Sequence, residues 1–161
     1  RKTLLHAGYW TNVRPEYSPS GREITFNSDR GGYNSSVWTM RANGSHVRRL
    51  TPPSLEGFWA DFSPDGRTII FSDNANRPAT NTWTVRASGG ALHMLTHLQT
   101  AGGGGGFSSY SPSGTQIVTL GGDACASTSN CFSIMNADGS RLHPVITGIP
   151  NTFLTDWGSG P

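Results

Sequence analysis

The sequence predicts an all-β fold built from three similar four-stranded antiparallel units. Three observations indicate this: a short turn motif occurs three times, strand-like runs flank every copy, and no segment combines helical periodicity with helix caps. The motif reads aromatic-Ser-Pro-Ser/Asp-Gly, and its copies begin at Tyr17, Phe62 and Tyr110. The copies start 45 and then 48 residues apart, a period typical of a radial or solenoidal array rather than of one irregular domain.

The first two strands of each unit lie on either side of the motif. We expect the first strands to end at the motif's aromatic residue, over 14–17, 59–62 and 107–110. Runs that alternate β-branched or aromatic residues with other residues follow the motif, and we expect the second strands there, over 23–26, 68–71 and 116–120.

The remaining two strands are separated by a second turn. We expect the third strands over 37–40, 82–85 and 132–135, each followed by a turn pair: Asn43-Gly44, Ser88-Gly89 or Asp138-Gly139. Short runs over 47–51, 92–96 and 142–147 then close the units. Four strands in about 45 residues is the size of one β-propeller blade.

These boundaries give the expected domain organisation. Residues 1–161 form one partial β-propeller with complete blades over about 14–51, 59–96 and 107–147. Residues 1–13 match the last strand of a preceding blade, and residues 148–161 match the first strand of a following blade. The expectation is therefore one strand, three blades and one strand, as in the C-terminal part of a longer propeller.

The repeated unit resembles a known family. Aromatic-Ser-Pro-Asp-Gly-x-x-Ile-x-Phe, an aromatic-x-Met strand, Asn/Asp-Gly-Ser and Leu-Thr together resemble the TolB-like, WD40-like (PD40) propeller repeat. Residues 15–51 fit nearly end to end, residues 60–96 fit almost as well, and residues 108–147 fit with an altered middle. The resemblance implies a propeller fold. It implies less about chemistry, because the family includes periplasmic scaffolds, peptidase-associated propellers and some lyases.

Composition and charge argue against several classes of function. The formal net charge is +2, and the eleven arginines and one lysine look scattered along the sequence, which argues against binding to nucleic acid or to an anionic membrane. No run of about 18 apolar residues is present, so no transmembrane helix is expected. The chain does not begin with Met, so we interpret it as mature, processed or excerpted.

Two cysteines flank a short polar stretch in the predicted third unit. A disulfide between Cys125 and Cys131 would close this loop and stabilise it by about 2–3 kcal/mol on chain-entropy reasoning. It would also place the protein outside the cytoplasm, in an extracellular or periplasmic compartment. The alternative is two unpaired thiols.

Three blades are too few to close a ring, because propellers usually have four to eight. An open stack would leave two apolar blade faces bare, with aromatic residues such as Tyr17, Trp38 and Phe71 on them. We therefore expect a protein partner, a second copy or further blades of a longer chain to complete the ring.

Several residues are candidates for binding. The position before the motif aromatic carries Glu16, Asp61, Ser109 and Asp156, three of which are acidic. Because first strands are innermost, these carboxylates could line a channel and bind a cation or a basic peptide. Alternatively, each caps a turn or pairs with an arginine. Arg14, Trp10 and Trp59 are further candidates for partner recognition, although Trp59 could instead fill the core between blades.

Catalytic motifs are not evident. The five histidines lack metal-ligand spacing, and no nucleophile elbow or phosphate loop is found, so we expect no catalytic residues, metal or cofactor. The favoured function is a non-catalytic extracellular scaffold that recognises a protein, peptide or carbohydrate. The alternative is the propeller portion of an enzyme, either a gating propeller of a peptidase or a polysaccharide lyase.

Overall fold

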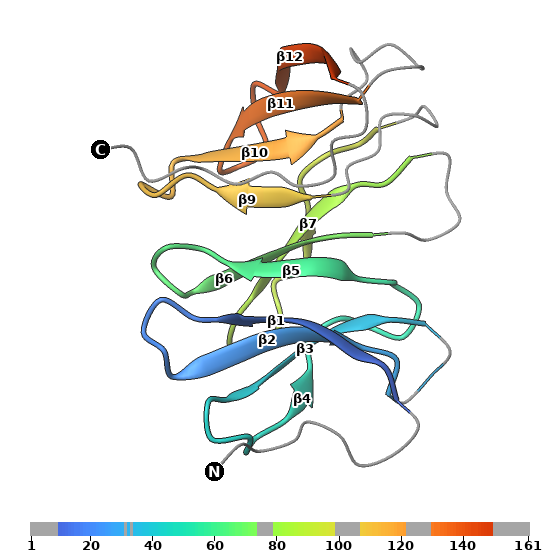
Figure 1. Cartoon of the computed structure of the whole chain (residues 1–161), viewed down its shortest axis with the longest axis vertical. Coiled ribbons are helices and arrows are strands. Elements are labelled where there is room, and N and C mark those ends of the chain that lie inside the picture. Colours follow the sequence, from blue (N-terminus) through green and yellow to red (C-terminus); the bar gives the residue numbers. More distant parts are fainter. Residues whose placement is uncertain are drawn as a thin grey trace.

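The described residues form three four-stranded antiparallel sheets stacked along the long axis of the molecule (Figure 1). The computed structural model describes residues 10–30, 32, 34–73, 79–98, 107–121 and 130–149, and within these ranges all regular structure is β. The all-β prediction with four-stranded antiparallel blades is confirmed. Most of the residues expected to form partial strands at the two ends of the chain lie outside the described residues. Residues 12 and 13 instead begin the first strand of the first blade, and residues 148 and 149 end the last strand of the third.

Each blade runs from an inner to an outer strand in chain order. The first blade contains β1 (Asn12–Tyr17), β2 (Glu23–Ser28), β3 (Ser36–Arg41) and β4 (Arg48–Arg49). The second contains β5 (Phe58–Phe62), β6 (Thr68–Ser72), β7 (Thr82–Arg86) and β8 (His93–Met94). The third contains β9 (Ser108–Tyr110), β10 (Gln116–Leu120), β11 (Asn130–Asn136) and β12 (His143–Ile149). The outer strands β4 and β8 are shorter than the five-residue runs expected from the sequence.

The repeated motif forms the turn between the first two strands of every blade. In the first copy the Gly21 amide donates to the Ser18 carbonyl at 2.8 Å, and the Ser18 hydroxyl accepts from the Glu23 amide at 3.0 Å. Ser63 and Ser111 repeat this arrangement with Thr68 and Gln116. Because φ is +67° to +71° at the closing residue of each turn, glycine is favoured there.

Successive turns also contact one another across the blade boundary. Pro19 of the first blade packs over Gly66 of the second, and Pro64 of the second packs over Gly114 of the third. A Cβ atom at Gly66 or Gly114 would lie 3.6 or 3.7 Å from the proline Cδ atom, an ordinary van der Waals contact. The motif therefore sets both a hairpin within each blade and a contact between blades.

The core lies between the sheets rather than inside them. Val37 of the first blade packs against Phe62, Ile69 and Phe71 of the second, and all four are buried. Phe71 therefore does not lie on a bare blade face as expected, because the first blade covers it. Between the second and third blades, Ile70 and Leu95 pack against Ile117 and Met135. Period-two alternation therefore gives each central strand one side chain set for each neighbouring blade.

The two interfaces between blades differ in chemistry at three equivalent positions. Val37, Ala60 and Phe71 form an apolar trio in the first interface. The corresponding residues of the second interface are Thr82, Ser108 and Thr119. Their buried hydroxyls are hydrogen bonded, with the Ser108 Oγ 2.9 Å from both threonine Oγ1 atoms. Each polar group that folding takes from water there regains a partner.

Gly139 brings the backbone of the third blade close to that of the second. Its φ is +86°, and a Cβ atom there would lie 2.7 Å from the Leu95 carbonyl oxygen, too close for any real side chain. Gly90 has a similar φ of +77° but faces open space. Substitutions at the two glycines therefore distinguish the cost of backbone strain, which both share, from the cost of a clash between blades, which only Gly139 has.

We predict that Gly139→Ala lowers the free energy of unfolding by about 2–3 kcal/mol, whereas Gly90→Ala lowers it by about 1 kcal/mol. Both substitutions force alanine into the left-handed region, but only the first also pushes two backbones apart. Urea unfolding of the two variants and the wild type measures the difference. Equal losses would show that the third blade does not press on Leu95.

Candidate functional site

Three inner-strand side chains, one from each blade, converge in a stack. The Trp59 and Phe107 ring centroids are 4.5 Å apart with an interplanar angle of 44°. The Arg14 guanidinium carbon lies 5.6 Å from the Trp59 centroid and 5.1 Å from the Phe107 centroid, within range of a cation–π interaction with both rings. The stack joins residues 45 and 48 positions apart in the chain because they occupy the same place in each repeat.

One β-bulge in β1 and one in β5 set the directions of the Arg14 and Trp59 side chains. Val13 pairs with Asn27 and Glu16 with Thr25, so two residues of β1 stand opposite one residue of β2. The same irregularity occurs between Phe58 and Asp61 in β5. Arg14 and Trp59 are each the first of the two residues in their bulge, and both have φ of +53°. Bulges are typically found where a strand must redirect a side chain, often beside a functional site.

The predicted carboxylate positions occupy equivalent places in the register, but their surroundings differ. Glu16 is exposed, whereas Asp61 is half-buried and accepts a hydrogen bond from the Phe62 amide at 2.7 Å. Asp156 lies outside the described residues. Within the described ranges, no group of three or more His, Cys, Asp or Glu side chains is placed to hold a metal ion. The proposed carboxylate ring therefore stays a prediction.

The remaining predicted site residues are two tryptophans and two cysteines. Trp10 is 45% exposed, and among the described rings it makes no aromatic contact. Trp59 packs against Phe107 of the third blade, as the core-filling alternative predicts, and it is half-buried; its part in partner recognition stays a prediction. Cys131 is buried in β11, and Cys125 lies outside the described residues, so their pairing stays a prediction.

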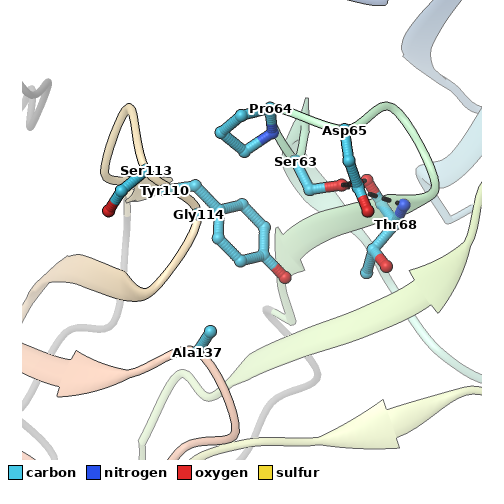
Figure 2. Close-up of a pocket in the computed structure, with 8 residues that line it drawn as sticks. All are labelled: Ser63, Pro64, Asp65, Thr68, Tyr110, Ser113, Gly114 and Ala137. Carbon is cyan, nitrogen blue, oxygen red and sulfur yellow. Dashed lines mark hydrogen bonds between the residues drawn. The ribbon is translucent and has the colours of Figure 1, made fainter.

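A pocket of about 530 Å³ lies between the second and third blades at the edge formed by the motif turns (Figure 2). It is lined by Ser63, Pro64, Asp65, Thr68, Tyr110, Ser113, Gly114 and Ala137. Figure 2 shows the Tyr110 ring lying between the two turns, with its hydroxyl directed into the pocket. The pocket is thus built from two copies of the repeated motif.

Two acidic groups in this pocket have shifted pKa values. The Ser63 hydroxyl donates to Asp65 at 2.6 Å and the Arg67 amide donates at 3.0 Å, and these bonds hold the pKa of Asp65 below its usual value. Burial, with a smaller contribution from the Asp65 charge, raises the pKa of Tyr110 to about 12. At neutral pH the pocket therefore combines an ionised carboxylate with a neutral phenol.

Sequence reasoning missed part of this site. Phe107 was not singled out, although it occupies the same repeat position as Arg14 and Trp59. Aligning the three repeats column by column would have found it. The role of Tyr110 was also missed, because the motif aromatic is Phe62 in the preceding blade and carries no hydroxyl there.

Known structures share this architecture. A TolB-type protein from Agrobacterium tumefaciens matches 84% of the chain with a TM-score of 0.68 at 24% identity, and the chain covers 50% of it. TolB from Acinetobacter baumannii matches 91% of the chain with a TM-score of 0.67 at 23% identity, and the chain covers 34% of it. An oligogalacturonate lyase solved in complex with manganese matches 84% of the chain with a TM-score of 0.64 at 15% identity, and the chain covers 36% of it.

The chain has a TolB-like β-propeller fold. It spans half or less of the length of these propellers, and identities below 25% show the fold alone. By sequence, an uncharacterized protein from Agrobacterium fabrum is 45% identical over 58 residues, which is 36% of this chain and 19% of the relative. No protein-family model matches the chain. Within the described part of the propeller, no helix is long and apolar enough to span a membrane.

We predict that Tyr110 makes the propeller less stable in alkali. The unfolded chain releases the phenol proton near pH 10.0 but the folded chain only near pH 12, so the unfolded state binds fewer protons between these values. Stability present below pH 10 is therefore lost as pH rises through this window, by about 1 kcal/mol near pH 11.

The matched variant is Tyr110→Phe, because phenylalanine fills the same motif position at Phe62. Urea unfolding of both proteins near pH 9 and near pH 11 tests the prediction. The stability of the wild type relative to the variant should fall between the two pH values. A difference that does not change with pH would contradict it.

Proposed function

We propose that this propeller segment is a non-catalytic binding scaffold that recognises a protein partner through its inner-strand stack. The observation that carries the proposal is the convergence of Arg14, Trp59 and Phe107 at one place. Trp and Arg are the residue types that most often dominate the energetics of protein recognition. Arg14 is exposed and Trp59 half-buried, so a partner can reach them without disturbing the blades.

Backbone strain supports the same conclusion. Arg14 and Trp59 hold positive φ values that cost of order 1–3 kcal/mol each in non-glycine residues. Simple core packing does not require the same unfavourable geometry in two successive blades. A selected direction for two recognition side chains does account for it.

Two alternative functions are compatible with the same fold. Carbohydrate rings also stack on aromatic side chains, so an oligosaccharide is the second ligand class. The enzyme alternative, a lyase or a peptidase propeller, rests on likenesses such as that to the oligogalacturonate lyase, which shares only 15% identity. We favour the protein-binding scaffold because the Arg14 guanidinium, which can form paired hydrogen bonds with a carboxylate, lies beside the Trp59 and Phe107 rings.

We predict that Arg14→Ala weakens binding of ligands found by screening the chain on peptide and glycan arrays, by about tenfold. Arg141→Ala is the matched control, because Arg141 is also exposed, with a similar φ of +58°, but lies in the third blade away from the stack. Arg14→Lys should restore little, because lysine keeps the charge but loses the planar stacking.

Equal affinities of the Arg14→Ala and Arg141→Ala variants would overturn the role of the stack. If the ligands whose affinity depends on Arg14 are glycans rather than peptides, the protein-binding assignment is wrong while the stack remains the site. Measured affinities by fluorescence anisotropy or calorimetry distinguish these results.

We also propose that the two outer blade faces bind further blades, supplied here by a second copy of the chain. Tyr17 is 63% exposed, although Phe62 at the same position of the next blade is 5% exposed under a neighbour. On the third blade, Val145 and Ile146 are 45% and 51% exposed. These apolar side chains are expected to be buried in a closed ring.

We predict that the 161-residue chain associates in solution, with a mass near twice the 17.2 kDa of one chain by light scattering. Tyr17→Glu should shift this equilibrium toward the monomer, because it places a charge on a face that needs to be dry. Tyr17 is already exposed in one chain, so the substitution should leave blade stability unchanged. A stable, compact wild-type monomer would contradict self-association.

An extracellular or periplasmic location is part of the proposal. It rests on the predicted disulfide between Cys125 and Cys131, since such bonds persist in oxidising compartments. Alkylation of both thiols only after reduction would support the disulfide, and alkylation without reductant would remove this support.

A further inference from the structure

The fold gathers arginines that look scattered in the sequence. Arg22 and Arg67 directly precede β2 and β6, and Arg41 and Arg86 end β3 and β7. The Ala42 amide donates to the Arg22 carbonyl at 2.8 Å, and the Ala87 amide donates to the Arg67 carbonyl at 2.8 Å. In each of the first two blades, an arginine pair therefore lies at the edge that carries the motif turn, left in Figure 1.

A groove of about 480 Å³ opens between the first two blades at this edge. Its lining includes three arginines and one acidic residue; the full set is Glu23, Arg48, Gly66, Arg67, Thr68, Arg86, Ala87 and Ser88. The groove is the counterpart of the pocket around Tyr110, one blade earlier. Here the equivalent walls are cationic, because the second blade carries Arg67 and Arg86 where the third carries Thr115 and Asn136.

The guanidinium groups in this groove are available to a ligand. Arg67 and Arg86 are exposed, and neither forms an ion pair or hydrogen bond through its side chain within the described part of the chain. Arg48 is half-buried and held in place, because it donates to the carbonyls of Ala87 and Ser88. The groove thus has one fixed guanidinium, that of Arg48, and two exposed ones, with Glu23 as the only carboxylate in its lining. The charge of Arg67 also helps to lower the pKa of the nearby Asp65.

The chemistry of the lining selects the kind of ligand. Guanidinium groups bind carboxylates through paired, charge-assisted hydrogen bonds. No aromatic ring lines the groove, so a sugar ring or a nucleobase has no surface on which to stack. The arginine pair of the first blade extends the positive charge beyond the groove at the blade repeat, which suits an extended chain carrying several carboxylates.

We propose that this groove binds an acidic, Asp- or Glu-rich peptide segment of a partner protein. Arg67 and Arg86 engage its carboxylates, and Arg48 supplies a fixed positive charge behind them. Arg22 and Arg41 meet the segment where it continues over the first blade. This surface is separate from the inner-strand stack, which contains none of these residues.

The test uses the whole chain and fluorescein-labelled octaglutamate as the probe. Fluorescence anisotropy in about 50 mM salt should show octaglutamate binding at least about tenfold tighter than octaglutamine, and the affinity should fall in about 300 mM salt. Arg67→Gln with Arg86→Gln should weaken binding about tenfold. Arg67→Lys with Arg86→Lys should recover only part of it, because lysine lacks the planar fork.

Two control variants make the result specific. Arg141→Gln removes one exposed arginine of the third blade and should leave octaglutamate binding unchanged, so it measures the effect of losing one positive charge outside the groove. Arg14→Ala should also leave it unchanged, which separates this groove from the inner-strand stack. Urea midpoints of the Arg67, Arg86 and Arg141 variants should match the wild type, since these residues are exposed. The Arg14→Ala variant should unfold at slightly lower urea, because it loses the cation–π contacts with Trp59 and Phe107.

Three outcomes would overturn the proposal. The first is equal loss in the Arg141→Gln variant and the double variant, which would indicate general attraction by net charge. The second is absence of binding by the wild type in low salt. The third is tighter binding of a sulfated oligosaccharide or single-stranded DNA than of octaglutamate, which would assign the groove to a different polyanion.

Discussion

The Ser-Pro-x-Gly turn is the constraint on which the rest of this structure depends. Within a blade, the Ser18 hydroxyl and carbonyl tie the turn to Glu23 and Gly21, which fixes where β1 begins to pair with β2. With that end fixed, the extra residue in β1 has to appear as a bulge further along the strand. The turn therefore determines, at a distance, which residue is turned toward the neighbouring blades.

The same turn also acts between blades. The proline ring of one copy rests on the glycine of the next, so the spacing of the blades is repeated from one turn to another. Glycine is favoured there by its positive φ rather than by the proline, because a Cβ atom would meet the proline ring only at van der Waals distance. One short motif thus links local backbone geometry to the arrangement of whole sheets.

The chemistry of the interfaces adds specificity to this repeated geometry. Thr82, Ser108 and Thr119 satisfy one another, but facing the apolar trio of the first interface their hydroxyls would lose partners. A buried hydroxyl without a partner costs about 1–3 kcal/mol. The order of the blades is set by chain connectivity, and matched side chains favour the correct pairing of faces at each interface.

Much of the fold was predictable from sequence, because its causes are local and repeated. The motif turns, the Gly-containing second turns and the alternating strands each depend on residues within about ten positions of one another. The bulges were not predictable in this way. They depend on how many residues of β1 and β5 oppose β2 and β6, and the positive φ falls on Arg14 and Trp59 rather than on glycine.

The candidate site was predicted only in part, for a related reason. Arg14 and Trp59 were identified from residue type, but their contact with Phe107 follows from stacking of three repeats. Exposure also depends on the neighbouring blade: Tyr17 and Tyr110 are the same residue in the same motif, yet one is 63% exposed and the other is half-buried with a raised pKa. Residue type alone does not contain this information.

The arginines show how a repeat architecture converts sequence periodicity into a surface. A net charge of +2 and arginines tens of residues apart suggest no field of one sign. In the folded protein, however, equivalent positions of adjacent blades lie at the same edge. Arg22 and Arg67 are separated by one repeat, as are Arg41 and Arg86, so these arginines gather into one positively charged surface. From Arg14 to the motif turn is a run of four strand residues, roughly 10 Å at normal strand rise. The inner-strand stack and the cationic groove can therefore contact different parts of one extended partner, and substitutions in one need not alter the other.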